Sequence, residues 1–211
     1  MSTQKISIHR ALSELKTYED RIQRAMQGAF VVANKRSNDK IQGKTVDEVK
    51  NLIKGNFASY QALSENMKRI KSAVVLSNAR TLVKIAGTEY TVAEAIERKA
   101  KIHFDESFLR VLQNQFQSQN NKVETENDQL PQKLENYLQS ILGDKDKRTV
   151  DDIEAHTKAF EGRNKYELID PCDIAKKIEQ LAQEIMNFKN EVDYVLSESN
   201  ATSFIEVDFV D

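Results

Sequence analysis

The side chains that could carry catalysis are few and scattered along the chain. The three histidines are His9, His103 and His156, and none has the cysteine or carboxylate spacing of a metal site. Cys172 follows a predicted helix start, which can activate a thiol, but no histidine is near it in sequence to act as a base. The chain also lacks a glycine-rich phosphate loop. We therefore expect no enzyme, no catalytic residue, no metal site and no cofactor.

Basic side chains gather around a predicted hairpin at residues 81–91. The members we assign to a ligand are Arg80, Lys84, Arg98 and Lys101. Because a planar guanidinium suits phosphate, these cations could form an anion site beside the hairpin. The competing interpretation pairs the cations at 98 and 101 with Glu94 and Glu97, one helical turn away on a solvated face.

A second set of polar side chains lies in "GRNKYELID" (162–170), which the sequence predicts to be extended between two helices. This set is Arg163, Asn164, Lys165 and Tyr166. A cation, an amide and an aromatic ring on a positioned loop could contact a nucleotide. The alternative is an ordinary connection with the aromatic ring and Leu168 packed inward.

Two similar stretches, "LSNARTLVKI" (76–85) and "LSESNATSFIEV" (196–207), predict joints between a long helix and a strand. Asparagine tolerates the left-handed conformation that ends helices, and serine can bond last-turn carbonyls. The alternative is that polar side chains of both joints converge on a ligand. The residues concerned are Asn78, Ser199 and Asn200.

Long helices must position these residues. Only six glycines and two prolines occur, 30% of residues are charged, and apolar residues recur at heptad spacing after Thr45, after Thr91 and after Pro171. Thr45, Thr91 and Thr149 each precede an acid by three residues, which predicts capped helix starts. Asn56 interrupts the first heptad run, either as a buried residue that sets register or as an exposed one.

The predicted fold class is mainly α: heptad-patterned helices in a bundle with a small β-sheet or hairpin. We expect strands near residues 29–33, 81–91 and 202–208, with the strands at 81–85 and 203–207 paired in one sheet. One domain, 1–211, is predicted, with a charged linker at 143–148.

Charge and composition exclude several classes of protein. The net charge of −2, from 31 basic and 33 acidic residues, disfavours nucleic acid as a partner. A single cysteine suits a reducing compartment. No apolar run approaches the length of a membrane span, and the first residues are too charged for a signal peptide. We therefore expect a cytoplasmic protein that does not contact membrane.

The stretches "LSNARTLVKIAGTEYTVAEAIERK" and "GRNKYELIDPCDIAKKIEQLAQEIMNFKNEVDYVLSESNATSFIEV" resemble a family of helical proteins from Gram-positive bacteria and their phages. The resemblance covers the last two thirds of the chain and supplies no catalytic residues. It implies a phage-associated protein in the host cytoplasm, of a kind that often counters host defence, sometimes by sequestering nucleotide signals.

Two functions follow as expectations. The first is a non-enzymatic protein that captures a small anionic, nucleotide-like ligand, such as a host immune signal. The alternative is a structural or interaction module that binds a host or phage protein through coiled-coil-like helices. Because apolar seams can be satisfied between chains, we also expect a homo-oligomer.

Overall fold

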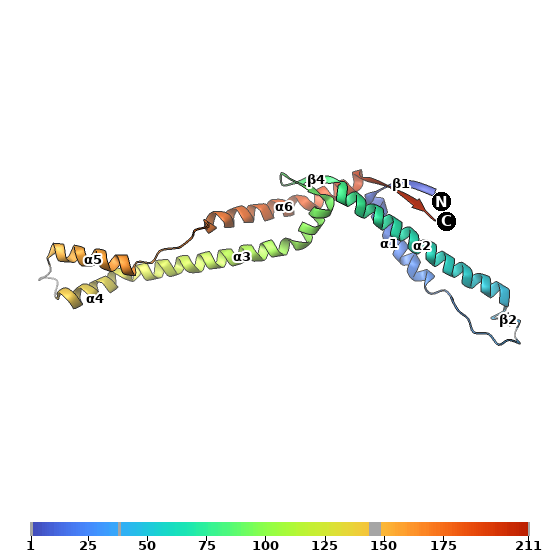
Figure 1. The fold of residues 1–211 in the computed structure, drawn as a ribbon, viewed down its shortest axis with the longest axis horizontal. Coiled ribbons are helices and arrows are strands. Elements are labelled where there is room, and N and C mark those ends of the chain that lie inside the picture. Colours follow the sequence, from blue (N-terminus) through green and yellow to red (C-terminus); the bar gives the residue numbers. More distant parts are fainter. Residues whose placement is uncertain (1, 38, 144–148, 211) are drawn as a thin grey trace. The chain divides into compact units, whose positions relative to one another are not determined.

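The computed structural model describes residues 2–37, 39–143 and 149–210 (Figure 1). Over these residues the chain is mainly helical with short antiparallel strand pairs, which confirms the predicted fold class. The helices are α1 (Ile8–Ala25), α2 (Val46–Arg80), α3 (Val92–Asp128), α4 (Leu130–Leu142), α5 (Val150–Asn164) and α6 (Ile174–Thr202). The strands are β1 (Ser2–Ser7), β2 (Lys40–Ile41), β3 (Lys44–Thr45), β4 (Leu82–Ile85), β5 (Thr88–Thr91) and β6 (Phe204–Phe209).

The chain divides into two compact units, each described by itself. Unit 1 comprises residues 1–100 and 187–211, and unit 2 comprises residues 101–186. Helices α3 and α6 each run from one unit into the other. The single domain stays a prediction, and the predicted linker at 143–148 lies outside the described residues apart from Gly143.

The three predicted threonine caps begin helices as expected. The backbone N–H of Glu48 donates to the Thr45 hydroxyl over 3.3 Å, while the Thr45 N–H donates to the Glu48 carboxylate over 2.7 Å. Thr91 and Glu94 repeat this capping box at the start of α3. At α5 the Thr149 hydroxyl accepts from the N–H of residue 152. Because each cap satisfies orphan backbone donors, the start of each helix is determined locally.

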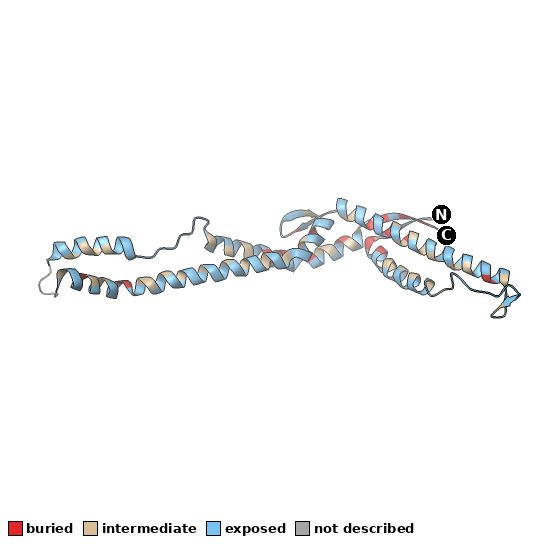
Figure 2. Ribbon diagram, turned by 60° about the horizontal axis from the view of Figure 1, so that its bottom comes forward, coloured by how far each residue is buried: buried red, intermediate tan, exposed pale blue. Residues whose placement is uncertain are grey.

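The core of unit 1 lies where the β1–β6 sheet meets α1 and α2 (Figure 2). Strands β1 and β6 pair antiparallel, with Ser7 opposite Phe204. Alternate residues of β6 are buried, as a half-covered strand requires. The buried residues of this cluster are Ile6, Ile8, Ala11, Ile70, Val74, Ile205, Val207 and Phe209.

Two predictions about strands are wrong, and one strand was not predicted. The unpredicted strand is β1, which precedes the start of α1 at Ile8. Residues 29–33 form no strand in the described structure, and Val31 is 88% exposed. The strands after the two joints do not share a sheet, because β4 pairs with β5 and β6 pairs with β1. The sequence pattern is local, so it does not indicate which distant segments pair.

The two joints nevertheless have the same construction. After α2, the Thr81 N–H bonds the Ser77 carbonyl, and the Thr81 carbonyl accepts from Val92, the first residue of α3. After α6, the Ser203 N–H bonds the Ser199 carbonyl, and its carbonyl accepts from Ile8, the first residue of α1. Each joint therefore ends one helix, opens an antiparallel strand pair and anchors the start of another helix. In the first joint a turn connects the strands; in the second the strands come from opposite ends of the described chain.

Two hairpins of the chain share a further feature. Gln42–Gly43 and Ala86–Gly87 all have positive φ, from 50° to 82°, as a two-residue type I′ turn requires. Both turns follow a Lys-Ile pair, and both hairpins end at a capping-box threonine. The hairpin predicted at 81–91 is thus confirmed, and a smaller relative of it precedes α2.

Asn56 fits neither of its two predicted roles. It is half-buried, and its side-chain amide donates to the backbone carbonyl of Ala29 over 3.0 Å. A Cβ built on Gly28 would lie 2.9 Å from the Asn56 amide nitrogen, so glycine leaves room for this contact. Asn56 therefore attaches the segment that follows α1 to the side of α2.

In unit 2, α4 and α5 pack through an aromatic cluster. The Tyr137 ring lies 4.9 Å from the Phe160 ring and 6.1 Å from the His156 ring, between centroids. Leu130 and Leu138 of α4 are buried, whereas no residue of α5 is. Helix α5 continues to Asn164, past the predicted start of the extended segment at residue 162. Helix α6 begins at Ile174, whose N–H donates to the Asp170 carboxylate over 2.7 Å.

Candidate functional site

The predicted ligand residues fall in both units. Asn78 and Arg80 lie in the last turns of α2, Lys84 on β4, Arg98 on α3, and Ser199 and Asn200 near the end of α6, all in unit 1. The others, Lys101, Arg163, Asn164, Lys165 and Tyr166, belong to unit 2.

Arg98 is engaged in packing beside the hairpin. Its guanidinium carbon lies 4.7 Å from the centroid of the Phe188 ring and 5.5 Å from that of the Tyr90 ring, and it donates to the Tyr90 hydroxyl. The two rings meet edge to face at 6.0 Å. A cation held between two aromatic faces stabilises the contact between β5, α3 and α6. This role explains the residue without a ligand.

Acidic residues of α6 that sequence reasoning missed fasten the hairpin and α3. The Ala86 N–H at the hairpin turn donates to the Glu191 carboxylate over 2.7 Å, and Lys99 pairs with Asp193. Arg80 and Lys84 are exposed, and Ser199 is buried where its backbone carbonyl terminates α6. The bonds that build the joints thus come from the backbone groups of Ser77, Thr81, Ser199 and Ser203.

The segment "RNKY" lines a shallow hollow of about 440 Å³ in unit 2, together with Glu126, Lys133 and Glu167. The Asn127 side chain accepts from the Tyr166 N–H and donates to the Tyr166 carbonyl, both over 2.9 Å. Lys122 lies over the Tyr166 ring, 5.8 Å from its centroid. Of the four predicted residues, Arg163 and Asn164 are in the last turn of α5, which corrects the extended assignment. The structure therefore brings this predicted set together at one surface.

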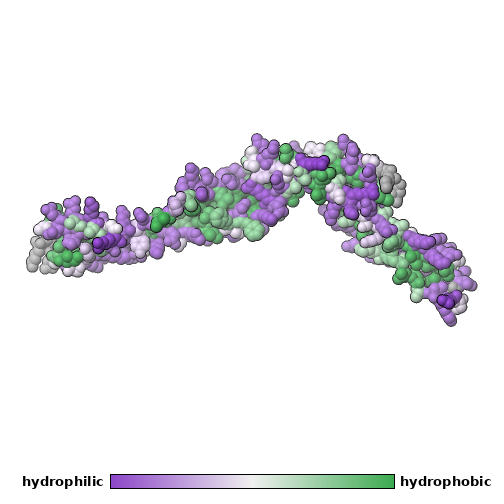
Figure 3. Space-filling view, in the orientation of Figure 1, coloured by the Kyte–Doolittle hydropathy of each residue, from purple (hydrophilic) through white to green (hydrophobic). Residues whose placement is uncertain are grey.

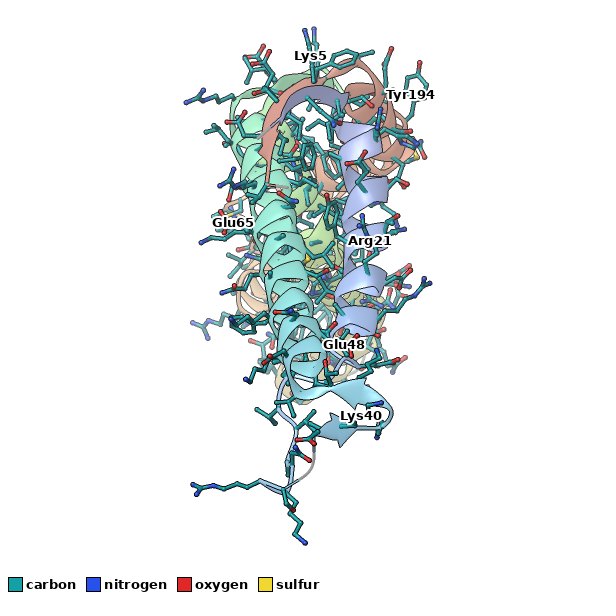
Figure 4. The ribbon with its side chains drawn as sticks, turned by 90° about the vertical axis from the view of Figure 1, so that its right-hand side faces the viewer. Lys5, Arg21, Lys40, Glu48, Glu65 and Tyr194 are labelled. Atoms are coloured by element: carbon teal, nitrogen blue, oxygen red, sulfur yellow. The ribbon has the colours of Figure 1, made fainter. Side chains whose placement is uncertain are left out.

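A larger groove of about 750 Å³ lies in unit 1 between α1 and α2. Figure 4 shows these two helices side by side, with Arg21 labelled on α1. Tyr18 and Arg21 line it from α1, and Ala62 and Asn66 line it from α2. Burial raises the pKa of the Tyr18 phenol; the Arg21 charge lowers it, and Glu14 raises it further. The sequence offered no motif for this groove, because its residues come from four elements.

Apolar side chains also reach the surface along the helices (Figure 3). On α2, Val75 and Leu76 are 65% and 52% exposed, beside Met67 and Ala79. Lys68 and Lys71 lie on the same face, and among the described residues no acidic side chain lines it. On α3, Phe104 and Phe108 are likewise more than half exposed.

Other kinds of site are not found within the described ranges. Among residues 2–37, 39–143 and 149–210, no three histidine, cysteine or carboxylate side chains gather closely enough to hold a metal ion. In the same ranges no helix combines the length and apolar character that crossing a bilayer needs.

Comparison of the chain with protein-family models, with curated proteins and with solved structures found no match.

Proposed function

We propose that this chain is a protein-interaction module that binds a partner helix along the outer face of α2. The observation that carries the proposal is the cluster of apolar residues on this face: Val75, Leu76 and Ala79 are exposed, and Met67 is half-buried at its edge. Apolar side chains at helical spacing are the usual anchors for an amphipathic helix.

The charges on this face indicate the chemistry of the partner. Lys68 and Lys71 lie among the apolar residues, and carboxylates are absent from the described lining. A partner helix that carries aspartate or glutamate beside its apolar stripe complements this pattern, whereas a basic helix would be repelled. A second copy of the same α2 face would bring lysines together, so the proposed occupant is a different, acidic helix.

Affinity capture with acidic substitutions at the apolar residues of this face tests the proposal. The immobilised chain is incubated with lysate from its native cell, and a protein retained by the wild type is then purified and its Kd measured. The double variant Val75→Glu, Leu76→Glu should weaken binding by about tenfold or more, since core interface residues dominate affinity. Lys54→Glu, an exposed α2 residue outside this face, should leave the Kd unchanged.

Two outcomes would contradict the proposal. One is a partner whose Kd is unchanged by the Val75, Leu76 variant but lost in Phe104→Ser, Phe108→Ser, because the contact would then be on α3. The other is that the wild type and its variant retain the same proteins.

Capture of a small anionic ligand is the second candidate, and the hollow lined by "RNKY" favours it. Arg163, Lys165 and Tyr166 offer two cations and a ring at one surface, although Glu126 and Glu167 also line it. Nucleotide-like anions, including signals of host defence, fit this proposal. Calorimetric titration with nucleotides and cyclic dinucleotides tests it: binding that disappears in Arg163→Gln supports capture, and no heat from any of them excludes it.

A further inference from the structure

The groove between α1 and α2 is a distinct concave site of unit 1. Its volume of about 750 Å³ falls within the range of small-molecule sites, roughly 300–1,000 Å³. It lies beyond the core cluster that joins Ile8 and Ala11 to Ile70 and Val74, where the two helices are closed against each other. Phe209, the last residue of β6, and Val210 form one limit of the groove.

Short side chains on α2 create the space. Ala58, Ser59 and Ala62 lie within about one turn of each other and line the groove opposite Thr17, Tyr18 and Arg21 of α1. A larger residue at position 58 or 62 would occupy this volume. Ala58 and Ala62, with Leu63 and Phe209, form the apolar part of the lining, which we call the apolar floor. Gln4, Thr17, Ser59 and Asn66 add polar groups around it.

The charge of the groove is set by Arg21. Glu14, the acid on the same wall, is already bonded to Arg10, with Nε and Oε1 2.9 Å apart. The Arg21 guanidinium lies 5.6 Å from the centroid of the Tyr18 ring, and no described carboxylate forms an ion pair with it. The α1 wall therefore presents one guanidinium over the Tyr18 ring, next to the apolar floor.

The backbone around the groove is held firmly. The Asn66 side chain donates to the Val210 carbonyl over 2.9 Å and accepts from its N–H over 2.7 Å. Asn66 is 6% exposed, so this contact fixes the last described residue against α2. A groove whose end is fixed in this way is largely formed before a ligand arrives, which reduces the entropy lost on binding.

We infer that the groove binds a small apolar anion, with its aromatic or aliphatic body between α1 and α2 and its carboxylate, sulfonate or phosphate group on Arg21. A guanidinium binds such groups through paired hydrogen bonds, and the apolar floor accepts the rest of the ligand. This site is separate from the outer face of α2 and from the hollow at Tyr166.

Two fluorescent probes of similar shape test the inference on the full chain. The anion 8-anilinonaphthalene-1-sulfonate carries the group that Arg21 would bind, and N-phenyl-1-naphthylamine lacks it. Arg21→Gln should raise the Kd of the sulfonate about tenfold and leave that of the neutral probe unchanged. Arg24→Gln removes a charge from the same helix outside the groove and should change neither.

Filling the groove tests its position. Ala62→Leu should abolish binding of both probes, and Ala58→Leu provides the same test if the first variant is not folded by circular dichroism. Val75→Ser, on the outer face of α2, should leave both Kd values unchanged, so failure of the interaction proposal and failure of this one are distinguishable. Weak or absent sulfonate binding to the wild type overturns the inference. Equal effects of Arg21→Gln and Arg24→Gln, or unchanged binding in both filled variants, also overturn it.

Discussion

Single asparagines hold extended backbone in both units by the same geometry. In unit 1 the Asn66 carboxamide bonds both backbone groups of Val210, and in unit 2 Asn127 does the same for Tyr166. A carboxamide has a donor and an acceptor side by side, as a neighbouring strand does, so each side chain takes the place of a strand residue. In the heptad pattern these positions are indistinguishable from surface asparagines.

Removing the Asn66 carboxamide should therefore destabilise the fold. In Asn66→Ala the N–H and carbonyl of Val210 lose their partners in a partly buried position, so we expect the free energy of unfolding to fall by about 2 kcal/mol. Urea denaturation followed by circular dichroism measures the change. Asn51→Ala, an exposed asparagine on the same helix, is the matched control and should change stability by less than about 0.5 kcal/mol. Equal losses in both variants would contradict the strand-like role.

The capping boxes make helix starts sensitive to pH. The Thr91 N–H and then its hydroxyl lower the pKa of the Glu94 carboxyl, and Thr45 lowers that of Glu48 in the same way. Because the pKa is lower in the folded state, the stabilisation is present above the ordinary pKa of glutamate. It is lost as the pH falls through the lowered pKa.

Titration of the carboxyl carbon resonances by NMR checks this expectation. In the wild type both glutamates should titrate below the ordinary pKa of glutamate. Thr91→Ala removes the hydroxyl bond, so the Glu94 midpoint should rise while the Glu48 midpoint stays in place. A Glu94 midpoint at its ordinary value in the wild type would show that the capping box is not formed.

At the scale of elements, the hairpin turns offer a direct test of backbone geometry. Ala86 adopts φ of 50° in a position where asparagine or glycine is favoured, because the left-handed region costs an alanine about 1 kcal/mol. Ala86→Asn keeps the backbone N–H that bonds Glu191 and should raise the free energy of unfolding by about 0.5–1 kcal/mol. Urea midpoints compare the variants. Gly87→Ala, at φ of 82°, should have the opposite sign, and stabilisation by it would refute the turn assignment.

The sequence predicts features that depend on neighbouring residues, but not those that depend on residues far apart in the chain. Caps at Thr45, Thr91 and Thr149 and the hairpin at 82–91 depend on residues a few positions apart, so the sequence sufficed. Strand β1 pairs with β6, which is far from it in the sequence. No local pattern in "STQKIS" predicts this pairing. The apolar run at 30–32 suggested a strand, but no other strand lies against it in the described structure.

For the candidate sites, too, contiguous residues could be predicted and residues from distant elements could not. The sequence identified the "RNKY" residues as one set because they are contiguous, and the structure places them around one hollow. The groove between α1 and α2 was missed because it combines α1, the small side chains at 58 and 62, and the end of β6. The cations near the hairpin were grouped correctly along the chain, but Arg98 is occupied by Tyr90 and Phe188.

At the scale of the whole molecule, the two units bury very different amounts of apolar side chain. Unit 1 has a contiguous cluster from β1, α1, α2 and β6, whereas α5 in unit 2 buries no residue. Since burial of apolar surface supplies most of the stability of a fold, unit 2 should open more readily than unit 1. Hydrogen exchange should accordingly be faster in α4 and α5 than in α2 around Ile70.

Paired core truncations test whether the units open independently. Leu138→Ala removes a buried side chain of α4 and should destabilise its surroundings by about 2 kcal/mol or more, which corresponds to about 30-fold faster amide exchange in α4 and α5. Amides of α1 and α2 should keep their rates. Ile70→Ala is the reciprocal variant: it should accelerate exchange in α1, α2 and β6, because these elements share its core, and leave α4 and α5 unchanged. Mass spectrometry of exchanged peptides separates these regions. Equal acceleration of both units by either variant would mean that the chain opens as one cooperative body, and the division into two units would then not describe its stability.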